Sequence, residues 1–172
     1  MLQYVFSLAF ILQTKQHKMV DCIHVNTNEE YAEAADLFRE YAAWLNIDLG
    51  FQRFDEELKT LKEMYAPPYG GIILAKEGNE FTGSIAIRKI DHDTAELKRM
   101  YVRPSYQQQG IGAILLKQAL SLAKRSGYKK IRLDTLANMT PAINLYKRNG
   151  FYEIPPYYHN PESNAVYFEK IL

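Results

Sequence analysis

The feature that most constrains the fold is a predicted strand that leads through a glycine-rich turn into a strongly amphipathic helix. The strand is "TAELKRMYV" (94–102), the turn contains "QQQGIG", and the helical pattern extends from Gly110 to Ser126, with Gly127 as its C-cap. Its apolar side chains recur along one stripe and its polar side chains along the opposite face. A helix that follows a strand in this way favours a crossover to a parallel neighbouring strand. This part of the chain is therefore expected to be α/β.

The residues before this unit predict a short strand and two helices. Residues 22–26 ("CIHVN") read as the strand, and Thr27 to Glu30 match a capping box at the start of an amphipathic helix that continues to residue 45. A second helical pattern covers residues 54–65 and stops before two prolines, which a helix interior does not accept. One continuous second helix is expected there.

Three consecutive antiparallel strands are predicted next. "GIILA" (71–75) reads as a buried strand, Gly78 and Asn79 as a tight turn, and residues 85–90 as a partner strand that leads to the strand 94–102. After the glycine-rich turn, strand and helix alternate instead.

The second half is expected to contain strand, helix, strand, helix and strand, connected by parallel crossovers. "KKIRLDTL" (129–136) has the alternation of a strand, and Thr140 and Pro141 read as an N-cap and first-turn pair for a helix that ends at Gly150. "NAVYFEKIL" (164–172) supplies the last strand. The crossovers bring the strand ends together, near the glycine-rich turn.

Composition excludes several classes of protein. The 172 residues suit one domain, and 21 Lys plus Arg against 20 Asp plus Glu, without a long basic run, give no electrostatic footprint for nucleic acid. A single cysteine, Cys22, cannot form an intrachain disulfide, and no Cys/His cluster has the spacing of a zinc site. We expect a cytoplasmic protein without a structural metal, and the sequence leaves a homodimer open.

The N-terminus is apolar between residues 2 and 12 but too short to cross a membrane, which takes about 20 apolar residues. It also lacks the charged start and the cleavage site of a signal peptide. Two interpretations remain. Either residues 1–18 are an extension that precedes the working start at Met19, or they form an extra helix on the domain. The domain itself is assigned to residues 19–172.

The glycine-rich turn is suited to a phosphate group. A helix that starts at such a turn leaves backbone N–H groups unpaired, with the positive end of the helix dipole behind them. Two glycines can also simply make a tight turn. A Rossmann site is disfavoured because Leu115 stands where the third glycine belongs, and no Walker loop is present. A pyrophosphate held by backbone amides is the remaining interpretation.

These residues resemble the GNAT superfamily of acyl-CoA-dependent N-acyltransferases. Gln107, Gly110 and Gly112 match its Q/RxxGxG/A signature, "AELKRMYVRP" resembles the strand before that loop, and "AINLYKRNGF" resembles its closing helix. The resemblance is good over residues 80–155 and weak over the first 50. It implies a three-layer α-β-α fold with a central mixed, mostly antiparallel sheet of six to seven strands.

The resemblance also implies a binding site for acetyl-CoA as the acyl donor. Its pyrophosphate would lie in the loop, and its pantetheine along the end of the strand. The implied binding residues are Met100, Tyr101, Val102, Gln107, Gln108, Gln109, Gly110, Ile111, Gly112, Ala113 and Asn138. Met139 occupies the position seven residues before Tyr146, where the family usually has an asparagine, so the assignment of Asn138 departs from the family pattern.

Two residues are candidates for the chemistry. Tyr146 matches the family's general acid, because a phenol with a pKa of about 10 stays protonated and can give a proton to a departing thiolate; it can also be a core tyrosine. Glu96 is the candidate base, with an ion pair to Lys98 or Arg99 as the alternative. His159 is a second candidate base.

The predicted activity is transfer of the acetyl group of acetyl-CoA to an amine by direct attack on the thioester. Because no acidic surface stretch is evident in the sequence, we expect the acceptor to be a small amine or amino-acid derivative rather than a protein tail. The implied acceptor cleft contains Phe51, Phe54, Tyr65, Tyr69, Tyr157, Tyr158 and His159. The alternative is a non-catalytic acyl-CoA-binding sensor or interaction module, which would not need a proton donor at residue 146.

Overall fold

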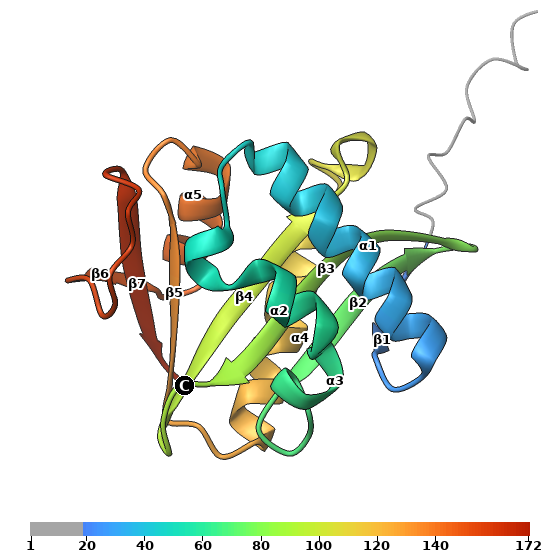
Figure 1. Ribbon diagram of the computed structural model, residues 1–172, viewed down its shortest axis with the longest axis horizontal. Helices are drawn as coiled ribbons and strands as arrows, with labels where there is room; N and C mark the ends of the chain where they lie inside the picture. The colour runs from blue at the N-terminus through green and yellow to red at the C-terminus, as the bar shows by residue number, and fades with distance from the viewer. Residues whose placement is uncertain (1–18) are drawn as a thin grey trace, which may run out of the picture.

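A computed structural model of the chain describes residues 19–172 (Figure 1). The predictions for residues 1–18 lie outside this range. Seven strands form one sheet in the order β1-β2-β3-β4-β5-β7-β6, and all neighbours are antiparallel except β4 and β5. The strands are β1 (Val20–His24), β2 (Gly71–Glu77), β3 (Glu80–Lys89), β4 (Thr94–Val102), β5 (Lys130–Leu136), β6 (Tyr152–Ile154) and β7 (Ala165–Ile171).

Helices cover both faces of this sheet. They are α1 (Asn28–Leu45), α2 (Phe54–Lys59), α3 (Leu61–Met64), α4 (Ile111–Arg125) and α5 (Thr140–Arg148), with short 3₁₀ turns η1 (Gly50–Gln52) and η2 (Pro104–Tyr106). In Figure 1, α1 to α3 lie in front of the strands and α4 lies behind them. The three-layer fold with a mixed, mostly antiparallel sheet is thereby confirmed.

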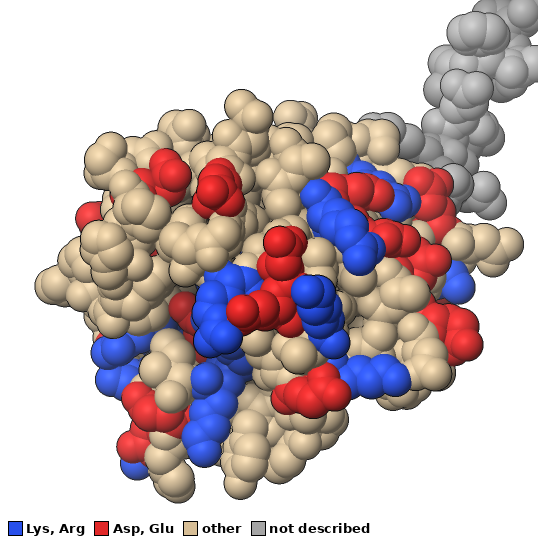
Figure 2. All heavy atoms as spheres, viewed as in Figure 1, with Lys and Arg blue, Asp and Glu red and all other residues tan. Residues whose placement is uncertain are grey.

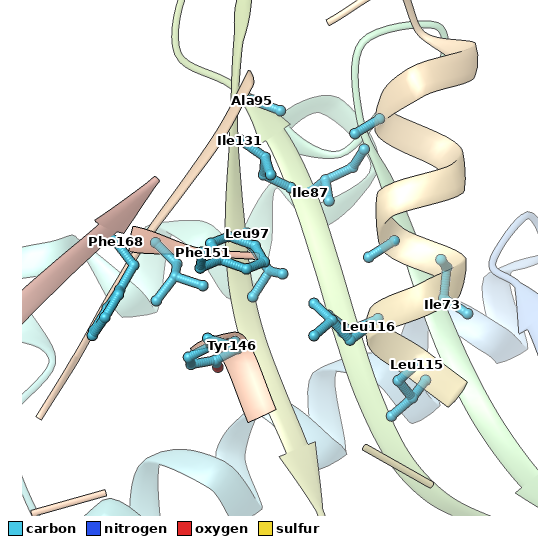
Figure 3. Close-up of a cluster of buried hydrophobic side chains, with 14 of the residues drawn as sticks. Ile73, Ile87, Ala95, Leu97, Leu115, Leu116, Ile131, Tyr146, Phe151 and Phe168 are labelled. Atoms are coloured by element: carbon cyan, nitrogen blue, oxygen red, sulfur yellow. The ribbon is translucent and has the colours of Figure 1, made fainter. Parts of the chain in front are cut away.

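Each face of the sheet has its own apolar core. The core under α4 and α5 includes Leu97, Leu115 and Ile131, and Figure 3 shows part of this cluster. The core under α1 and α3 includes Phe38 and Leu74. Burial on both faces explains why the central strands are apolar at successive positions.

Local signals explain where the first helices begin and end. The Thr27 side chain accepts a hydrogen bond from the Glu30 amide at 3.2 Å, and the Glu30 carboxylate accepts one from the Thr27 amide at 3.1 Å, which confirms the capping box. The single helix predicted over 54–65 is wrong. It is divided at Thr60, whose hydroxyl donates to the Glu56 carbonyl oxygen at 2.8 Å and whose φ of −124° is not helical.

The second half differs from its prediction in three places. The crossover through α4 from β4 to β5 is parallel, as predicted, but β7 runs antiparallel to β5. The short strand β6 was not predicted, and it pairs with β7. Thr140 is the first residue of α5 rather than its N-cap, and its side chain caps nothing.

A bulge interrupts β4 in its second half. Tyr101 pairs with Ser84 and Lys98 pairs with Ala86, so two residues of β4, Arg99 and Met100, lie opposite one residue of β3. Arg99 has a φ of +54°, in the left-handed region, and its carbonyl oxygen accepts a hydrogen bond from the Ser84 hydroxyl at 3.0 Å. Such a bulge bends a strand and redirects its side chains.

Candidate active site

The site lies where β4 and β5 separate. The two strands pair only over the register Thr94–Glu96 with Lys130–Arg132, and beyond it a hollow opens between them. We call this space the inner hollow. Its lining includes Lys98 and Met100 from β4, Asp134 from β5, and Met139 and Tyr146 from the start and middle of α5. Side chains from α1 and from the segment before α2 close its other side.

A second space, which we call the outer cleft, adjoins the inner hollow. It lies between the η1–α2 segment, the ends of β3 and β4, and the loop before β7, and it includes Arg88, Glu96 and Tyr157 in its lining. Phe51, Gln52 and Lys98 line both spaces. These three residues therefore mark the junction of the outer cleft and the inner hollow.

The glycine-rich turn has the geometry of a backbone anion site. Gly110 caps α4 with a φ of +85°, and Gln108 also has a positive φ of 61°. Within residues 19–172, the amides of 108–112 donate no hydrogen bond to protein acceptors. The Gln107 side chain donates to the Val102 carbonyl oxygen at 2.9 Å, which fixes the loop against the end of β4. Several N–H groups thus remain free at the positive end of α4.

Gly112 keeps α4 close to the inner hollow. A Cβ atom at this position would lie 3.3 Å from Cε of Met100 and 3.6 Å from Cδ2 of Leu145. A larger side chain would have to displace both. Ile111 is buried in the core, so only its backbone amide faces the loop.

Tyr146 is both a core residue and part of the hollow. Its ring packs with Phe151 and Phe168 at centroid distances of 5.6 and 6.4 Å, as Figure 3 shows, and its exposed fraction is 5%. Its hydroxyl donates to the Met100 sulfur at 3.4 Å. Burial raises the pKa of Tyr146 well above the ordinary value of a tyrosine. The phenol is therefore protonated throughout the neutral range.

Glu96 is buried but does not line the inner hollow. One carboxylate oxygen accepts a hydrogen bond from Nε of Arg88 at 2.7 Å, and the other accepts one from the Tyr157 hydroxyl at 2.9 Å. The alternative prediction for Glu96, an ion pair with Lys98 or Arg99, is wrong, because its cationic partner is Arg88. Arg99 instead donates from Nε to Glu57 of α2 at 2.9 Å.

Sequence reasoning missed a carboxylate that does line the inner hollow. Asp134 of β5 accepts a hydrogen bond from the Tyr158 hydroxyl at 2.7 Å, and its other oxygen lies 3.7 Å from Nζ of Lys98. The signal was present, because Asp134 is an acidic residue near the carboxyl end of a strand predicted to run parallel to 94–102. Lys98 also donates to Oε1 of Gln52 at 3.0 Å.

The other residues predicted to bind the acyl donor do not all face the inner hollow. The Tyr101 side chain packs against α1, with its ring centroid 6.0 Å from those of Tyr41 and Trp44, so only its backbone can face a donor molecule. Met139 lines the inner hollow, whereas Asn138 is exposed and does not. Gln109 is also exposed, and its side chain donates to the Ser105 carbonyl oxygen at 3.2 Å.

The aromatic residues predicted for an acceptor cleft are only partly brought together. Phe51, Tyr157 and Tyr158 line the outer cleft. Tyr65 is a core residue with an exposed fraction of 1%, and Tyr69 is exposed. The prediction failed for Tyr65 because its hydroxyl is used inside the protein, as a donor to Glu57 at 2.6 Å.

The fold and this loop define an acyltransferase, and the chain belongs to the GNAT family of acetyltransferases. The family model described as "Acetyltransferase (GNAT) family" matches residues 31–151. This match begins well before residue 80, which is the first residue of the stretch with a good resemblance in the sequence. Function as an N-acetyltransferase follows from this membership.

Relatives and solved structures agree with this assignment. An uncharacterized N-acetyltransferase of Schizosaccharomyces pombe is 38% identical over 133 residues, which cover 76% of this chain and 82% of the relative. The fold matches an acetyltransferase from Streptococcus agalactiae with a TM-score of 0.74 at 24% identity, over 89% of this chain and 98% of that one. It also matches a GNAT acetyltransferase from Elizabethkingia anophelis with acetyl-CoA bound, with a TM-score of 0.61 at 23% identity, over 89% and 98%.

Two further kinds of feature are absent from the described range. Between residues 19 and 172, no helix combines the length and the apolar character needed to cross a bilayer. The same residues contain no group of three or more His, Cys, Asp or Glu side chains placed to hold a metal ion.

Proposed function

We propose that the protein transfers the acetyl group of acetyl-CoA to a small amine by direct attack of the amine on the thioester. The observation that carries this proposal is the closeness of the glycine-rich turn to the inner hollow: a Cβ atom at Gly112 would lie 3.3 Å from Cε of Met100, and Met100 lines the hollow. A donor bound by its pyrophosphate at the turn can extend its acyl end into the hollow. The single cysteine, Cys22, is a free thiol, which fits a reducing cytoplasm.

The donor would be held mostly by backbone groups. Its pyrophosphate would accept hydrogen bonds from the amides between Gln107 and Ala113, and its pantetheine would lie along Met100 to Val102. The unpaired edge of β4 beyond Glu96 supports this placement, since β5 has already diverged there. Asn138 remains a proposed contact at the exposed start of α5.

Tyr146 would act as the general acid. As the amine nitrogen forms its bond to the carbonyl carbon and the C–S bond breaks, the tyrosine hydroxyl would give its proton to the departing thiolate. The raised pKa of Tyr146 supports this role, because it keeps the proton in place at neutral pH. Its contact with a sulfur atom, that of Met100, supports the position.

Glu96 would receive the amine proton. Both of its oxygens already accept hydrogen bonds, so the proton would travel through a water molecule or the Tyr157 hydroxyl rather than directly. This route connects the outer cleft, where an amine would enter, with the buried carboxylate. Glu96 gains the amine proton and the thiolate gains the proton of Tyr146, so one proton must return from Glu96 to the Tyr146 phenolate, through water, before the next turnover.

An acetyl-CoA assay over a panel of amines, amino acids and peptides tests the proposal, with release of the free thiol as the readout. We expect thiol release with at least one small amine and none with peptides. Tight binding of acetyl-CoA by calorimetry without thiol release for any amine would contradict it. That outcome would favour the alternative, a non-catalytic acyl-CoA-binding sensor.

A further inference from the structure

The outer cleft has a basic lining, although the whole chain is nearly neutral. One acidic residue lines the cleft, Glu96, and four basic residues do so: Arg53, Arg88, Lys89 and Lys98. The formal net charge of the chain is only +1. Figure 2 shows Lys and Arg side chains gathered on the face that carries α2 and α3, with acidic side chains among them. The lining of the cleft therefore has a formal excess of positive charge, although Arg88 is paired with Glu96 and Arg53 with Glu56.

The one carboxylate in this lining is already neutralised. Nη2 of Arg88 lies 2.7 Å from Oε2 of Glu96, and the Tyr157 hydroxyl binds the other oxygen. Arg53 pairs with Glu56, and Lys89 lies over the Tyr69 ring, 4.5 Å from its centroid. A cationic group that entered this cleft would find no free acidic partner in its lining.

Lys98 is the buried cation at the junction of the two spaces. Its exposed fraction is 5%, and it lines both the inner hollow and the outer cleft. An ammonium group has three protons to donate. Among the described residues, Lys98 makes one hydrogen bond, to Gln52 at 3.0 Å, and its ion pair with Asp134 is longer, at 3.7 Å. The ammonium thus has donor capacity left for a ligand.

The electrostatics of Lys98 agree with an anion site. Burial lowers the pKa of its ammonium, although the charges of Glu96 and Asp134 act in the opposite direction. An anion that binds beside a buried ammonium stabilises its charged form, so a bound carboxylate would raise the pKa of Lys98 again.

The two spaces are lined by different charged side chains. Asp134 lines only the inner hollow, together with Lys98 and with Arg99, and Arg99 is already paired with the buried Glu57. Arg53, Arg88 and Lys89 line only the outer cleft. A molecule that carries both charges would be oriented by this arrangement. Its carboxylate would remain at Lys98 on the basic side, and its ammonium would point toward Asp134 and the thioester.

We propose that the acceptor is a small amino acid whose carboxylate binds at Lys98 while its amine enters the inner hollow. This inference rests on the proposed acetyltransferase function and names its substrate class. Because Lys98 borders both spaces, only a few bonds can separate the two groups of the acceptor. A polyamine is disfavoured, since its additional cations would have to occupy the basic cleft.

Matched acceptors test this inference on the unmodified protein. Each amino acid in the panel is compared with its own amide and methyl ester, and spermidine is included as a polyamine. The amide and the ester keep the amine but lack the negative charge. We expect kcat/KM, measured by thiol release from acetyl-CoA, to be at least about tenfold higher for the free acid, because the amide and the ester cannot make a charged hydrogen bond with the Lys98 ammonium.

The outcomes separate the inference from the proposed function. Equal rates for acids and amides, or a preference for spermidine, would overturn the carboxylate site and leave the acetyltransferase function intact. Bound acetyl-CoA without thiol release for any amine would overturn both.

A pair of variants assigns the preference to Lys98. In Lys98→Met the ratio of kcat/KM for acid over amide should fall toward one, and in Lys98→Arg, which keeps the charge, it should remain well above one. Lys124→Met removes an exposed lysine on α4 and should leave the ratio unchanged. An unchanged ratio in a folded Lys98→Met protein would rule out Lys98 as the anchor. If that variant does not fold, the acid and amide comparison on the unmodified protein still decides the inference.

Discussion

The two halves of β4 belong to the same strand but have different surroundings. From Thr94 to Glu96 the strand pairs with β5, and Ala95 is completely buried in the core under α4. From Leu97 to Val102 it loses β5, contains a bulge at Arg99, and borders the inner hollow instead. The first half is held by sheet pairing and apolar packing. The second half keeps its pairing with β3 on one side, and on the other side side-chain contacts from other elements replace β5.

This difference shows how the fold provides space for chemistry without a gap in its core. A strand that diverges from its neighbour leaves polar backbone groups unpaired, which is costly unless a ligand or water satisfies them. In β4 these unpaired groups lie beyond Glu96, on the side where β5 has diverged. Substitutions around the second half of β4 should therefore affect ligand binding and catalysis more than substitutions of the same kind elsewhere in the protein.

The largest effect is expected at the glycine-rich turn. Replacing Gly110 and Gly112 together by valine should abolish acetyl-CoA binding in calorimetry, because Gly110 needs a positive φ and a side chain at 112 would press on Met100. Gly127→Ala is the matched control, since Gly127 has the same φ of +85° at the other end of α4. It should cost stability but leave the affinity unchanged. Unchanged affinity in the double variant would show that the pyrophosphate does not bind there.

The second effect concerns the side chain that fixes the bulge. Arg99→Met should lower the free energy of unfolding by about 3–5 kcal/mol, because Glu57 would remain buried without its cation. Arg103→Met is the control: it removes a cation from a more exposed pair with Glu40 and should cost about 0–1 kcal/mol. Denaturant unfolding measures both. Similar losses would mean that the bulge is not held by this ion pair.

The ion pair between Glu57 and Arg99 should also make the free energy of unfolding depend on pH. Burial alone would raise the pKa of Glu57, but its hydrogen bonds and charge interaction with Arg99 outweigh burial and hold that pKa below its ordinary value. A carboxyl with a lowered folded-state pKa stabilises the fold above its unfolded pKa, and this contribution disappears as the pH falls through the folded pKa. Unfolding measured from pH 7 down to the acid range should show this loss in the natural protein and a smaller one in Arg99→Met.

A smaller effect is expected from the proposed acid. Tyr146→Phe keeps the ring in the core, so acetyl-CoA affinity should remain nearly intact while kcat falls by about 10²-fold. Because burial raises the pKa of Tyr146, its ionisation should cause no loss of rate at moderately alkaline pH. Tyr128→Phe is the control, since Tyr128 has the same exposed fraction of 5% in the same core. Turnover at the natural rate in Tyr146→Phe would remove Tyr146 from the mechanism.

The smallest effect is expected at the N-terminus. A chain that starts at Met19 should fold and bind acetyl-CoA as the full chain does, because it contains the whole of the described sheet, from the pairing of Val20–His24 with β2 onward. Melting temperature and calorimetry compare the two chains. Insolubility of the shorter chain, or a large fall in its melting temperature, would mean that residues 1–18 are a packing element of the domain.

Local signals made most of the fold predictable. The capping box at Thr27 begins α1, and the glycines at 110 and 127 delimit α4, because each acts through residues close to it in the chain. The loop was predicted as an anion site from its glycines and the helix that follows, whereas the roles of acetyl-CoA and Tyr146 were predicted from similarity to a family motif. Strand β6 was missed, since three residues without alternation form a strand only when β7 is beside them.

The candidate site was less predictable, because its contacts depend on register. Glu96 pairs with Arg88 because the two residues are directly opposite each other in the β3–β4 hairpin, and the sequence pattern alone does not specify that register. Asp134 and Lys98 meet across strands that have already separated. No local pattern encodes such a contact, so it depends on the fold as a whole.

The bulge at Arg99 also determines which side chains reach each side of the sheet. In a regular strand, Leu97 and Tyr101 would share one face and Met100 would lie on the other. Here Leu97 and Met100 pack with the core under α4, and Tyr101 packs with the core under α1. The extra residue of the bulge therefore exchanges the two faces of the sheet for the side chains of β4 that follow it. A deletion of Arg99 would let β4 continue as a regular strand with Met100 and Tyr101 on the faces that they already occupy, but it would remove the cation that pairs with the buried Glu57.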